Sequence, residues 1–376
     1  MIQRLCSILD VFELAGDVVD IIPCKAGHIN DTFIAAVQAG KEVERYTLQR
    51  INSVVFPRPD LIMHNIRIVT EAIEKKAGGE RGDCDLRPLA LVQTRAGESY
   101  YKDDDGAYWR CYHYVEGITY NQVPPDKEGL LIAREAAAAF RRFGDHLGKL
   151  NVRNLHVTIE DFHNTPVRFA RLREAIAGDS HKRTHDASRE IESALAWEDL
   201  CGAITEPLQR GHIPLRVTHN DTKINNVVFD DDCKQGPKAL CVIDLDTVMP
   251  GSLLFDFGDL VRSSVCERSE DETDLDTIQI NLKIFEALVG GFCTNPGGGP
   301  PSLTQSEREL LVTACLVITF ETAVRFLTDY LMGDVYFRTE RPRHNLDRAR
   351  TQFRLLADME RKRGALEQII TENVQW

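Results

Sequence analysis

Short apolar segments separated by polar turns dominate the first third of the chain, and this alternation predicts an antiparallel sheet. Strand, turn and strand are expected over residues 21–37, followed by strands over residues 45–51, 89–92 and 109–115. Apolar residues at positions 62, 66, 69 and 73 recur at helical spacing, which predicts an amphipathic helix over residues 60–73. We therefore expect an N-terminal lobe made of five strands and one helix.

The hydrophobic period changes to that of helices from about residue 132 onward. Helices are expected over residues 133–150, over two charged stretches within residues 166–210, and over residues 307–332 with one apolar stripe. The extended segment from Tyr112 to Gly117 lies between the two patterns and is predicted to be a hinge. The chain is thus predicted to be α+β, with an N-terminal lobe of residues 1–117 and a mainly helical lobe of residues 118–376.

A histidine, two aspartates and an asparagine in the middle of the chain have the order and spacing of a catalytic loop followed by a hairpin. The segment His219–Asn226 has the spacing H-x-D-x-x-x-x-N, and Asp244 follows the next apolar strand. Asp221 and Asn226 are five residues apart, so a regular helix would not bring them together, whereas a loop can. The expected hairpin over residues 226–243 returns the chain to this loop. We therefore expect Asp221, Asn226 and Asp244 to converge.

This set of side chains is the one that phosphoryl transfer from ATP requires, namely a carboxylate to accept a hydroxyl proton and oxygen ligands for Mg²⁺. We assign the catalytic base to Asp221, and the metal ligands to Asn226 and Asp244. Asp246 is either the ligand of a second metal ion or a loop residue, and the sequence leaves both alternatives open. His219 is expected to pack and hold the loop.

Two backbone segments of the N-terminal lobe are predicted to contact the nucleotide. Backbone N–H groups in the turn before residue 32 can cradle phosphates, and extended backbone at the hinge can meet the purine edge. The candidate residues of the turn are Gly27, His28, Asn30 and Thr32. Those of the hinge are Tyr112, Tyr114 and Val115.

A cation is also needed at the phosphates, and protein kinases use a lysine on the third strand for this purpose. In this chain Arg50 takes the matching place in the sequence. An arginine can bind phosphate through its planar fork, although it is not equivalent to lysine. Glu71 and Asn65 of the predicted helix are both possible partners of Arg50.

Composition limits the remaining classes of function. The 376 residues carry a net charge of −13, which argues against a nucleic-acid-binding face. No apolar run reaches the ~18 residues of a membrane span, and the start of the chain lacks the apolar stretch of a signal peptide. The ten cysteines contain no C-x-x-C pair, which is typical of reduced thiols. We expect a cytoplasmic protein that is monomeric or weakly self-associating.

Several segments resemble the N-acetylhexosamine 1-kinases, within the kinase-like superfamily of aminoglycoside phosphotransferases and choline kinases. They are residues 27–32, 48–52, 218–223, 243–251, 325–337 and 344–353. The resemblance implies a protein-kinase-like bilobal fold, and transfer of phosphate from ATP with Mg²⁺ to the anomeric 1-hydroxyl of GlcNAc or GalNAc. It also implies that Asp221 is the base, that Arg325 and Tyr336 contact the sugar, and that Asp31 lies near the phosphates or the sugar.

A physical argument agrees with the sugar acceptor that the resemblance implies. A neutral sugar is held by planar polar groups and by aromatic faces, and Arg325 and Tyr336 supply one of each. The alternative for Arg325 is an ion pair with Glu321 or Asp329, which lie one helical turn away on either side. Two other functions stay open, a kinase for another small alcohol such as choline or an aminoglycoside, and a non-catalytic nucleotide-binding regulator.

Overall fold

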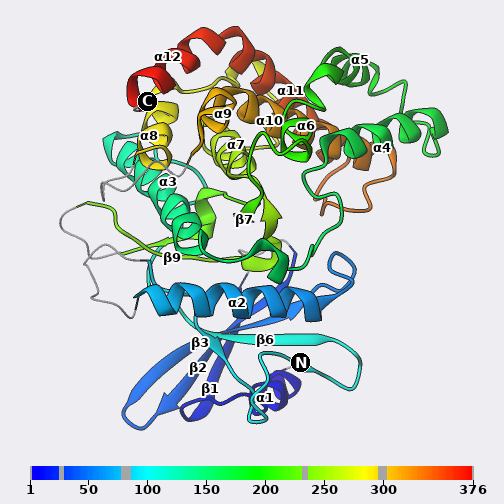
Figure 1. The fold of residues 1–376 in the computed structure, drawn as a ribbon. Helices are drawn as coiled ribbons and strands as arrows, with labels where there is room; N and C mark the ends of the chain where they lie inside the picture. The colour runs from blue at the N-terminus through cyan, green and yellow to red at the C-terminus, as the bar shows by residue number, and fades with distance from the viewer. Residues whose placement is uncertain (1, 25–28, 78–85, 231–235, 295–302, 375–376) are drawn as a thin grey trace.

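A computed structural model describes residues 2–24, 29–77, 86–230, 236–294 and 303–374, and it consists of two lobes (Figure 1). The N-terminal lobe holds an antiparallel sheet in the order β1-β2-β3-β6-β4, with β5 also paired to β6. Its strands are β1 (Asp17–Cys24), β2 (Asp31–Ala39), β3 (Glu42–Ile51), β4 (Leu91–Val92), β5 (Tyr101–Lys102) and β6 (Tyr108–His113). The predicted antiparallel sheet is confirmed, with six strands in place of five.

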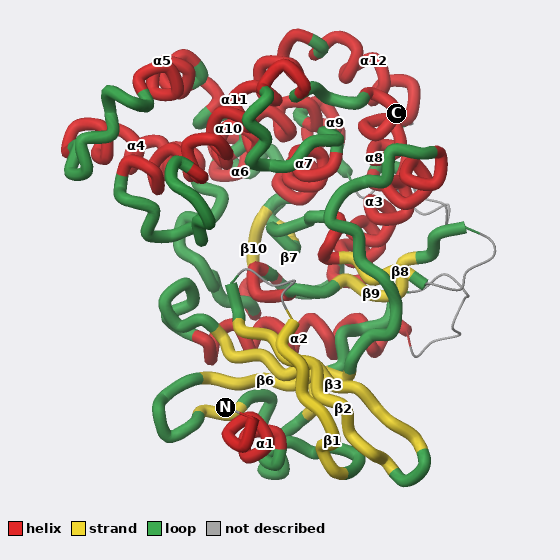
Figure 2. The backbone as a smooth tube through the Cα atoms, turned by 180° about the vertical axis from the view of Figure 1, so that it is seen from behind, coloured by secondary structure: helices red, strands yellow, loops and turns green. Residues whose placement is uncertain are grey.

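Two helices cover opposite faces of this sheet (Figure 2). Helix α2 (Pro59–Ala77) is the predicted amphipathic helix and lies between the sheet and the helical lobe. Helix α1 (Ile2–Leu9), which the sequence analysis missed, buries Leu5, Ile8 and Leu9 against the far face.

The second lobe is mainly helical and holds two small two-stranded sheets next to α2 (Figure 1). Its α-helices are α3 (Lys127–Leu147), α4 (Thr165–Gly178), α5 (Ser188–Ala196), α6 (Thr205–Gln209), α7 (Leu253–Ser264), α8 (Leu282–Phe292), α9 (Gln305–Glu309), α10 (Leu311–Leu331), α11 (His344–Arg361) and α12 (Arg363–Asn373). Its strands are β7 (Arg216–Thr218), β8 (Val227–Phe229), β9 (Ala239–Val242) and β10 (Met249–Gly251). Single 3₁₀ turns are η1 (Val152–Asn154), η2 (Glu198–Leu200), η3 (Ile224–Asn226), η4 (Leu245–Thr247) and η5 (Leu275–Thr277).

Helix α10 forms the centre of the helical lobe and corrects one sequence expectation. We expected a single apolar stripe and no apolar run long enough for a membrane span. Among the described helices, α10 alone is long and apolar enough by composition to cross a membrane, but 83% of its apolar stretch is buried within the fold. Helices α4, α7 and α11 surround it, so it is a core helix that is buried over most of its surface.

The hinge reaches the helical lobe by pairing with the hairpin that follows the catalytic loop. Ile118 and Phe229 exchange backbone hydrogen bonds of 3.0 and 2.8 Å. Gly117 has a φ of 151°, and a Cβ at this position would collide with the carbonyl group of Phe229. Only glycine therefore allows the hinge to approach the hairpin this closely.

Candidate active site

Tertiary hydrogen bonds hold the catalytic loop between β7 and η3 in an uncommon backbone conformation. Asn220 has a φ of 63°, in the left-handed region that side chains with a Cβ seldom occupy. The backbone N–H groups of His219 and Asn220 donate to the carboxylate of Asp256, from α7, at 3.1 and 2.7 Å. The amide of Asn220 also donates to the carbonyl of Thr247 at 2.9 Å. The loop is thus fixed before any substrate binds.

The predicted base and the predicted amide ligand lie next to each other in this loop. Nδ2 of Asn226 lies 2.9 Å from the backbone carbonyl of Asp221 and 3.3 Å from its carboxylate. Lys223, which the sequence analysis did not consider, lies 2.9 Å from the other carboxylate oxygen of Asp221. Burial opposes the charge of Asp221, but the attraction and hydrogen bond of Lys223 outweigh it and lower the pKa of the carboxyl. Asp221 is therefore ionised at neutral pH, as a base must be.

Asp244 lies two residues after β9 with a φ of 61°, at the wall of a cavity that it shares with Asn226. The surrounding protein, followed by the carboxylates of Asp246 and Asp221, raises the pKa of Asp244 to about 7. A cation placed here would relieve that repulsion. Oδ1 of Asn225, in the same cavity, is buried without a hydrogen-bond partner in the described part of the chain.

These donors fit Mg²⁺, with Asp244 and the amide oxygen of Asn226 as its protein ligands. The described residues contain no group of three His, Cys, Asp or Glu side chains that could enclose a metal ion. Mg²⁺ commonly takes one or two carboxylates and completes its shell with phosphate oxygens and water, so one carboxylate and one amide oxygen suffice on the protein side.

Asp246 has a different environment from that of Asp244. Its carboxylate forms a buried ion pair with Arg110 of β6, and its second oxygen accepts a hydrogen bond of 2.7 Å from Asn30. Both oxygens are occupied, so of the two alternatives left open by the sequence the structure favours the loop residue over the ligand of a second metal. Arg110 is another residue that the sequence analysis missed, although an arginine within the apolar strand Tyr108–His113 was a visible signal.

A cavity of about 270 Å³ lies between the hinge, the sheet and the catalytic loop. The predicted contacts Thr32, Tyr112, Tyr114 and Val115 line it together with Asn226 and Asp244. Asn30 lies beside it through its bond to Asp246. Gly27 and His28 lie outside the described residues.

The structure corrects the prediction for Arg50. Successive residues of a strand point to opposite faces, and here Gln49 faces the cavity. Arg50 instead pairs with Asp31 at an exposed position, with a distance of 2.7 Å from Nε to Oδ2. Neither proposed partner contacts Arg50, because Glu71 pairs with Arg67 and Asn65 bonds to the backbone of His156 and Val248. The same pair takes Asp31 away from the cavity.

The predicted sugar contacts lie in a second cavity, of about 340 Å³, on the side of the helical lobe that carries α4. The guanidinium of Arg325 lies over the rings of Phe162 at 5.1 Å, Phe337 at 5.5 Å and Tyr336 at 5.9 Å. The ion pairs considered as an alternative for Arg325 are not formed: Glu321 binds His163 and Thr165. Asp329 accepts hydrogen bonds from Asn345 and from the backbone of residues 335–337. Arg168 and Arg171 also line this cavity.

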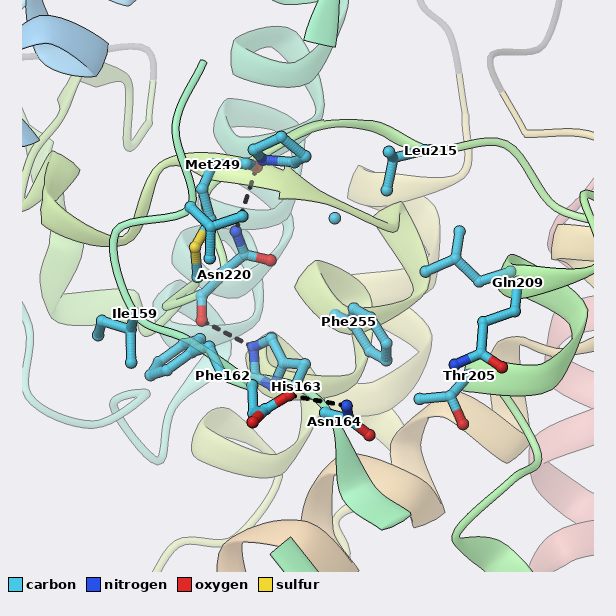
Figure 3. A pocket seen from close by; sticks show the side chains of 15 residues that line it. Ile159, Phe162, His163, Asn164, Thr205, Gln209, Leu215, Asn220, Met249 and Phe255 are labelled. Carbon is cyan, nitrogen blue, oxygen red and sulfur yellow. Dashed lines mark hydrogen bonds between the residues drawn. The ribbon is translucent and has the colours of Figure 1, made fainter. Parts of the chain in front are cut away.

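A buried histidine connects this side of the lobe to the catalytic loop (Figure 3). His163 lies 2.9 Å from the carboxylate of Glu321, on α10, and 3.0 Å from the carbonyl of Asn220. Burial opposes a charge on this ring, but Glu321 outweighs it and raises the pKa of His163. His163 and Asn220 also line a third cavity, of about 210 Å³, behind the loop.

Comparison with known proteins identifies the wider group. Residues 85–288, more than half of the chain, match the phosphotransferase enzyme family (APH). An aminoglycoside phosphotransferase from Alicyclobacillus acidocaldarius is similar in structure, with a TM-score of 0.57, 15% identity, and coverage of 97% of this chain and 96% of the other. A spectinomycin phosphotransferase in complex with ADP and spectinomycin has a TM-score of 0.56 and 12% identity, and the match covers 97% of this chain and 98% of the other. A microcompartment-associated aminopropanol kinase has a TM-score of 0.56 and 14% identity, and the match covers 98% of this chain and 99% of the other. At these identities the likeness concerns the kinase-like fold.

Proposed function

Because the chain belongs to the phosphotransferase enzyme family, we propose that it phosphorylates the anomeric 1-hydroxyl of an N-acetylhexosamine, GlcNAc or GalNAc, at the expense of ATP. The observation that carries this proposal is the convergence of Asp221, Asn226 and Asp244 beside a cavity that extends to the hinge. Mg²⁺, when bound at Asp244 and Asn226, would neutralise charge on the phosphates.

Residues of the catalytic loop and its neighbours would have separate roles in this phosphoryl transfer. Asp221, kept ionised by Lys223, would orient the acceptor hydroxyl and take its proton. As that proton moves, the acceptor oxygen forms a bond to the γ-phosphorus, and the bond from the γ-phosphorus to the leaving ADP breaks. Asp256 and His163 hold the N–H and the carbonyl group of Asn220, the residue before the base, which keeps Asp221 in place for this transfer.

Charge in the second cavity supports a neutral acceptor over a cationic one. Three guanidinium groups, Arg168, Arg171 and Arg325, line it. The carboxylate of Asp161 lies 3.5 Å from Arg171, and that of Asp329 also lines the cavity while it accepts hydrogen bonds from backbone N–H groups, so guanidinium groups outnumber carboxylates here. A protonated amine would be repelled by about 1 to 4 kcal/mol for each guanidinium at 4 Å, depending on solvent exposure. Two of the similar structures are named for aminoglycoside and aminopropanol acceptors. Such acceptors carry amines and suit this cavity poorly.

The same three arginines favour a second candidate, a sugar that carries a phosphate or a carboxylate. A guanidinium binds such groups with two parallel hydrogen bonds. The acceptor panel that tests the main proposal should therefore include an anionic hexosamine.

The test measures ATP consumption by purified protein with Mg²⁺ and GlcNAc, GalNAc, N-acetylglucosamine 6-phosphate, glucose, choline or kanamycin, followed by phosphorus NMR of the product. We expect a new anomeric phosphate with GlcNAc or GalNAc. Turnover with the 6-phosphate alone would support the second candidate. Turnover with choline or kanamycin alone, or with no acceptor in the panel, would contradict the N-acetylhexosamine assignment.

A further inference from the structure

The nucleotide phosphates need a cation from the N-terminal lobe, which protein kinases supply as a lysine on the third strand. The two β3 residues that line the cavity here, Thr47 and Gln49, are both uncharged. We propose that Arg110, on the neighbouring strand β6, is the cation that binds these phosphates. This inference rests on the proposed use of a nucleotide, but it does not depend on the identity of the acceptor.

Register brings Arg110 to the correct place. Strands β3 and β6 are antiparallel, and Gln49 is the direct partner of Arg110. Nε of Arg110 donates to Oε1 of Gln49 at 2.9 Å, and Gln49 in turn donates to the hydroxyl of Thr32 at 3.1 Å. All three residues line the cavity that also holds Asn226 and Asp244. A cation displaced by one strand therefore faces the same space as a lysine on β3 would.

The hydrogen-bonding capacity of Arg110 leaves room for a phosphate. A guanidinium has five N–H donors in one plane. In this structure, Nε is used by Gln49 and Nη1 by the carboxylate of Asp246, on the other lobe. Nη2 of Arg110 forms no hydrogen bond with the described residues, so it can donate to an oxygen in the cavity. Asp246 then has the role of a partner that keeps the fork oriented, as the glutamate of the kinase helix does for the lysine.

Arg50, the cation that the sequence suggested, is the competing candidate. Its side chain is 50% exposed, and its partner Asp31 is 53% exposed. Arg110 and Asp246 are 1% and 4% exposed. An ion pair buried at the wall of a nucleotide cavity loses little further solvation when a phosphate arrives, whereas Arg50 would first have to leave its strand face.

Calorimetric titration with ADP and with adenosine, both in the presence of Mg²⁺, tests the inference, because the two ligands differ by their phosphates. In Arg110→Gln we expect the affinity for ADP to fall by about tenfold or more while the affinity for adenosine stays within about twofold. Arg50→Gln is the decisive comparison, since the two candidates predict opposite results. Arg67→Gln, an exposed and ion-paired arginine on α2, serves as the matched control.

Arg110→Gln leaves Asp246 without its charged partner, so folding needs its own check. The double variant Arg110→Gln with Asp246→Asn removes both charges, and retained adenosine binding reports an intact cavity. Unchanged ADP affinity in these variants, a parallel loss of ADP and adenosine binding, or a selective loss of ADP binding in Arg50→Gln would each overturn the assignment. If the wild-type protein binds neither ligand, the proposed function fails and the inference fails with it.

Discussion

Nε2 of His163 lies 3.0 Å from the backbone carbonyl oxygen of Asn220, the residue before the candidate base (Figure 3). Nδ1 of the same ring faces Glu321 at 2.9 Å. Both neighbours are hydrogen-bond acceptors, so the doubly protonated ring, an imidazolium, is the form that satisfies both contacts. A buried cation thus links the core helix α10 to a loop residue with a left-handed backbone. The carboxyl groups of Asp259 and Asp256 also interact electrostatically with this ring.

This relationship predicts a positioning role for His163. In His163→Gln, only one of the two hydrogen bonds can be kept, and Glu321 loses its charged partner. We expect kcat to fall by about tenfold or more while the Kd for ADP, measured by calorimetry, changes little. An equal loss of ADP affinity would show a general structural defect instead.

The same pair predicts a pH dependence of stability. The pKa of His163 is raised in the folded state, so its charge contributes to the free energy of unfolding. This contribution is complete below about pH 6.5, the ordinary pKa of histidine, and is lost as pH rises through the higher folded-state pKa. The pKa of Glu321 is lowered by His163 against the opposing effect of burial, so its contribution is lost only as pH falls below the ordinary range for glutamate. Denaturant unfolding of the wild type and of the double variant His163→Gln with Glu321→Gln, between pH 4 and 9, measures the difference. The difference in the free energy of unfolding between the wild type and the double variant should become smaller as the pH rises toward 9. A difference that stays constant with pH would contradict a charged His163.

The base is tested by Asp221→Asn and by its neighbour Lys223. Asp221→Asn should lower turnover by about 10²- to 10⁴-fold while ADP still binds. Lys223→Met removes the charge that lowers the pKa of Asp221. The acidic limb of the kcat profile should therefore move to higher pH. An unmoved limb would mean that a different group is titrating.

The metal ligands predict a pH-dependent effect of Mg²⁺. The pKa of Asp244 is raised to about 7 by burial and by neighbouring carboxylates, so the group is largely protonated at pH 5.5 and ionised at pH 8. Because Mg²⁺ binds the ionised form, millimolar Mg²⁺ should raise Tm at pH 8 more than at pH 5.5. Asp244→Asn should abolish most of this difference. Asp246→Asn should keep the stabilisation by Mg²⁺ at pH 8, since Asp246 is bound to Arg110. It should narrow the difference between the two pH values, because it removes a carboxylate that raises the pKa of Asp244.

The acceptor cavity predicts a selective change in KM. Arg325→Ala should raise KM for the sugar by about tenfold or more and leave KM for ATP within about twofold, because Arg325 does not line the nucleotide cavity. Arg189→Ala, an exposed arginine of α5, is the control. Equal changes in both KM values would argue against a dedicated acceptor site at Arg325.

The sequence by itself determined the features that depend on neighbouring residues. Hydrophobic period predicts the antiparallel sheet, α2 and the helical lobe, since one face of each element must be buried. The order of His219, Asp221 and Asn226, with the hairpin that returns to Asp244, predicts the convergence at the catalytic loop. The reason is that the two ends of a short hairpin lie next to each other.

Tertiary structure alone decided the partners of the charged side chains. Arg50 and Arg110 are both strand arginines in the sequence, and only the register and facing of β3 and β6 place Arg110 at the cavity and Arg50 outside it. His163 is separated from Asn220 by 57 positions and from Glu321 by 158. No local pattern encodes contacts at such separations, because they arise when α10 packs at the centre of the lobe and its neighbours arrange themselves around it.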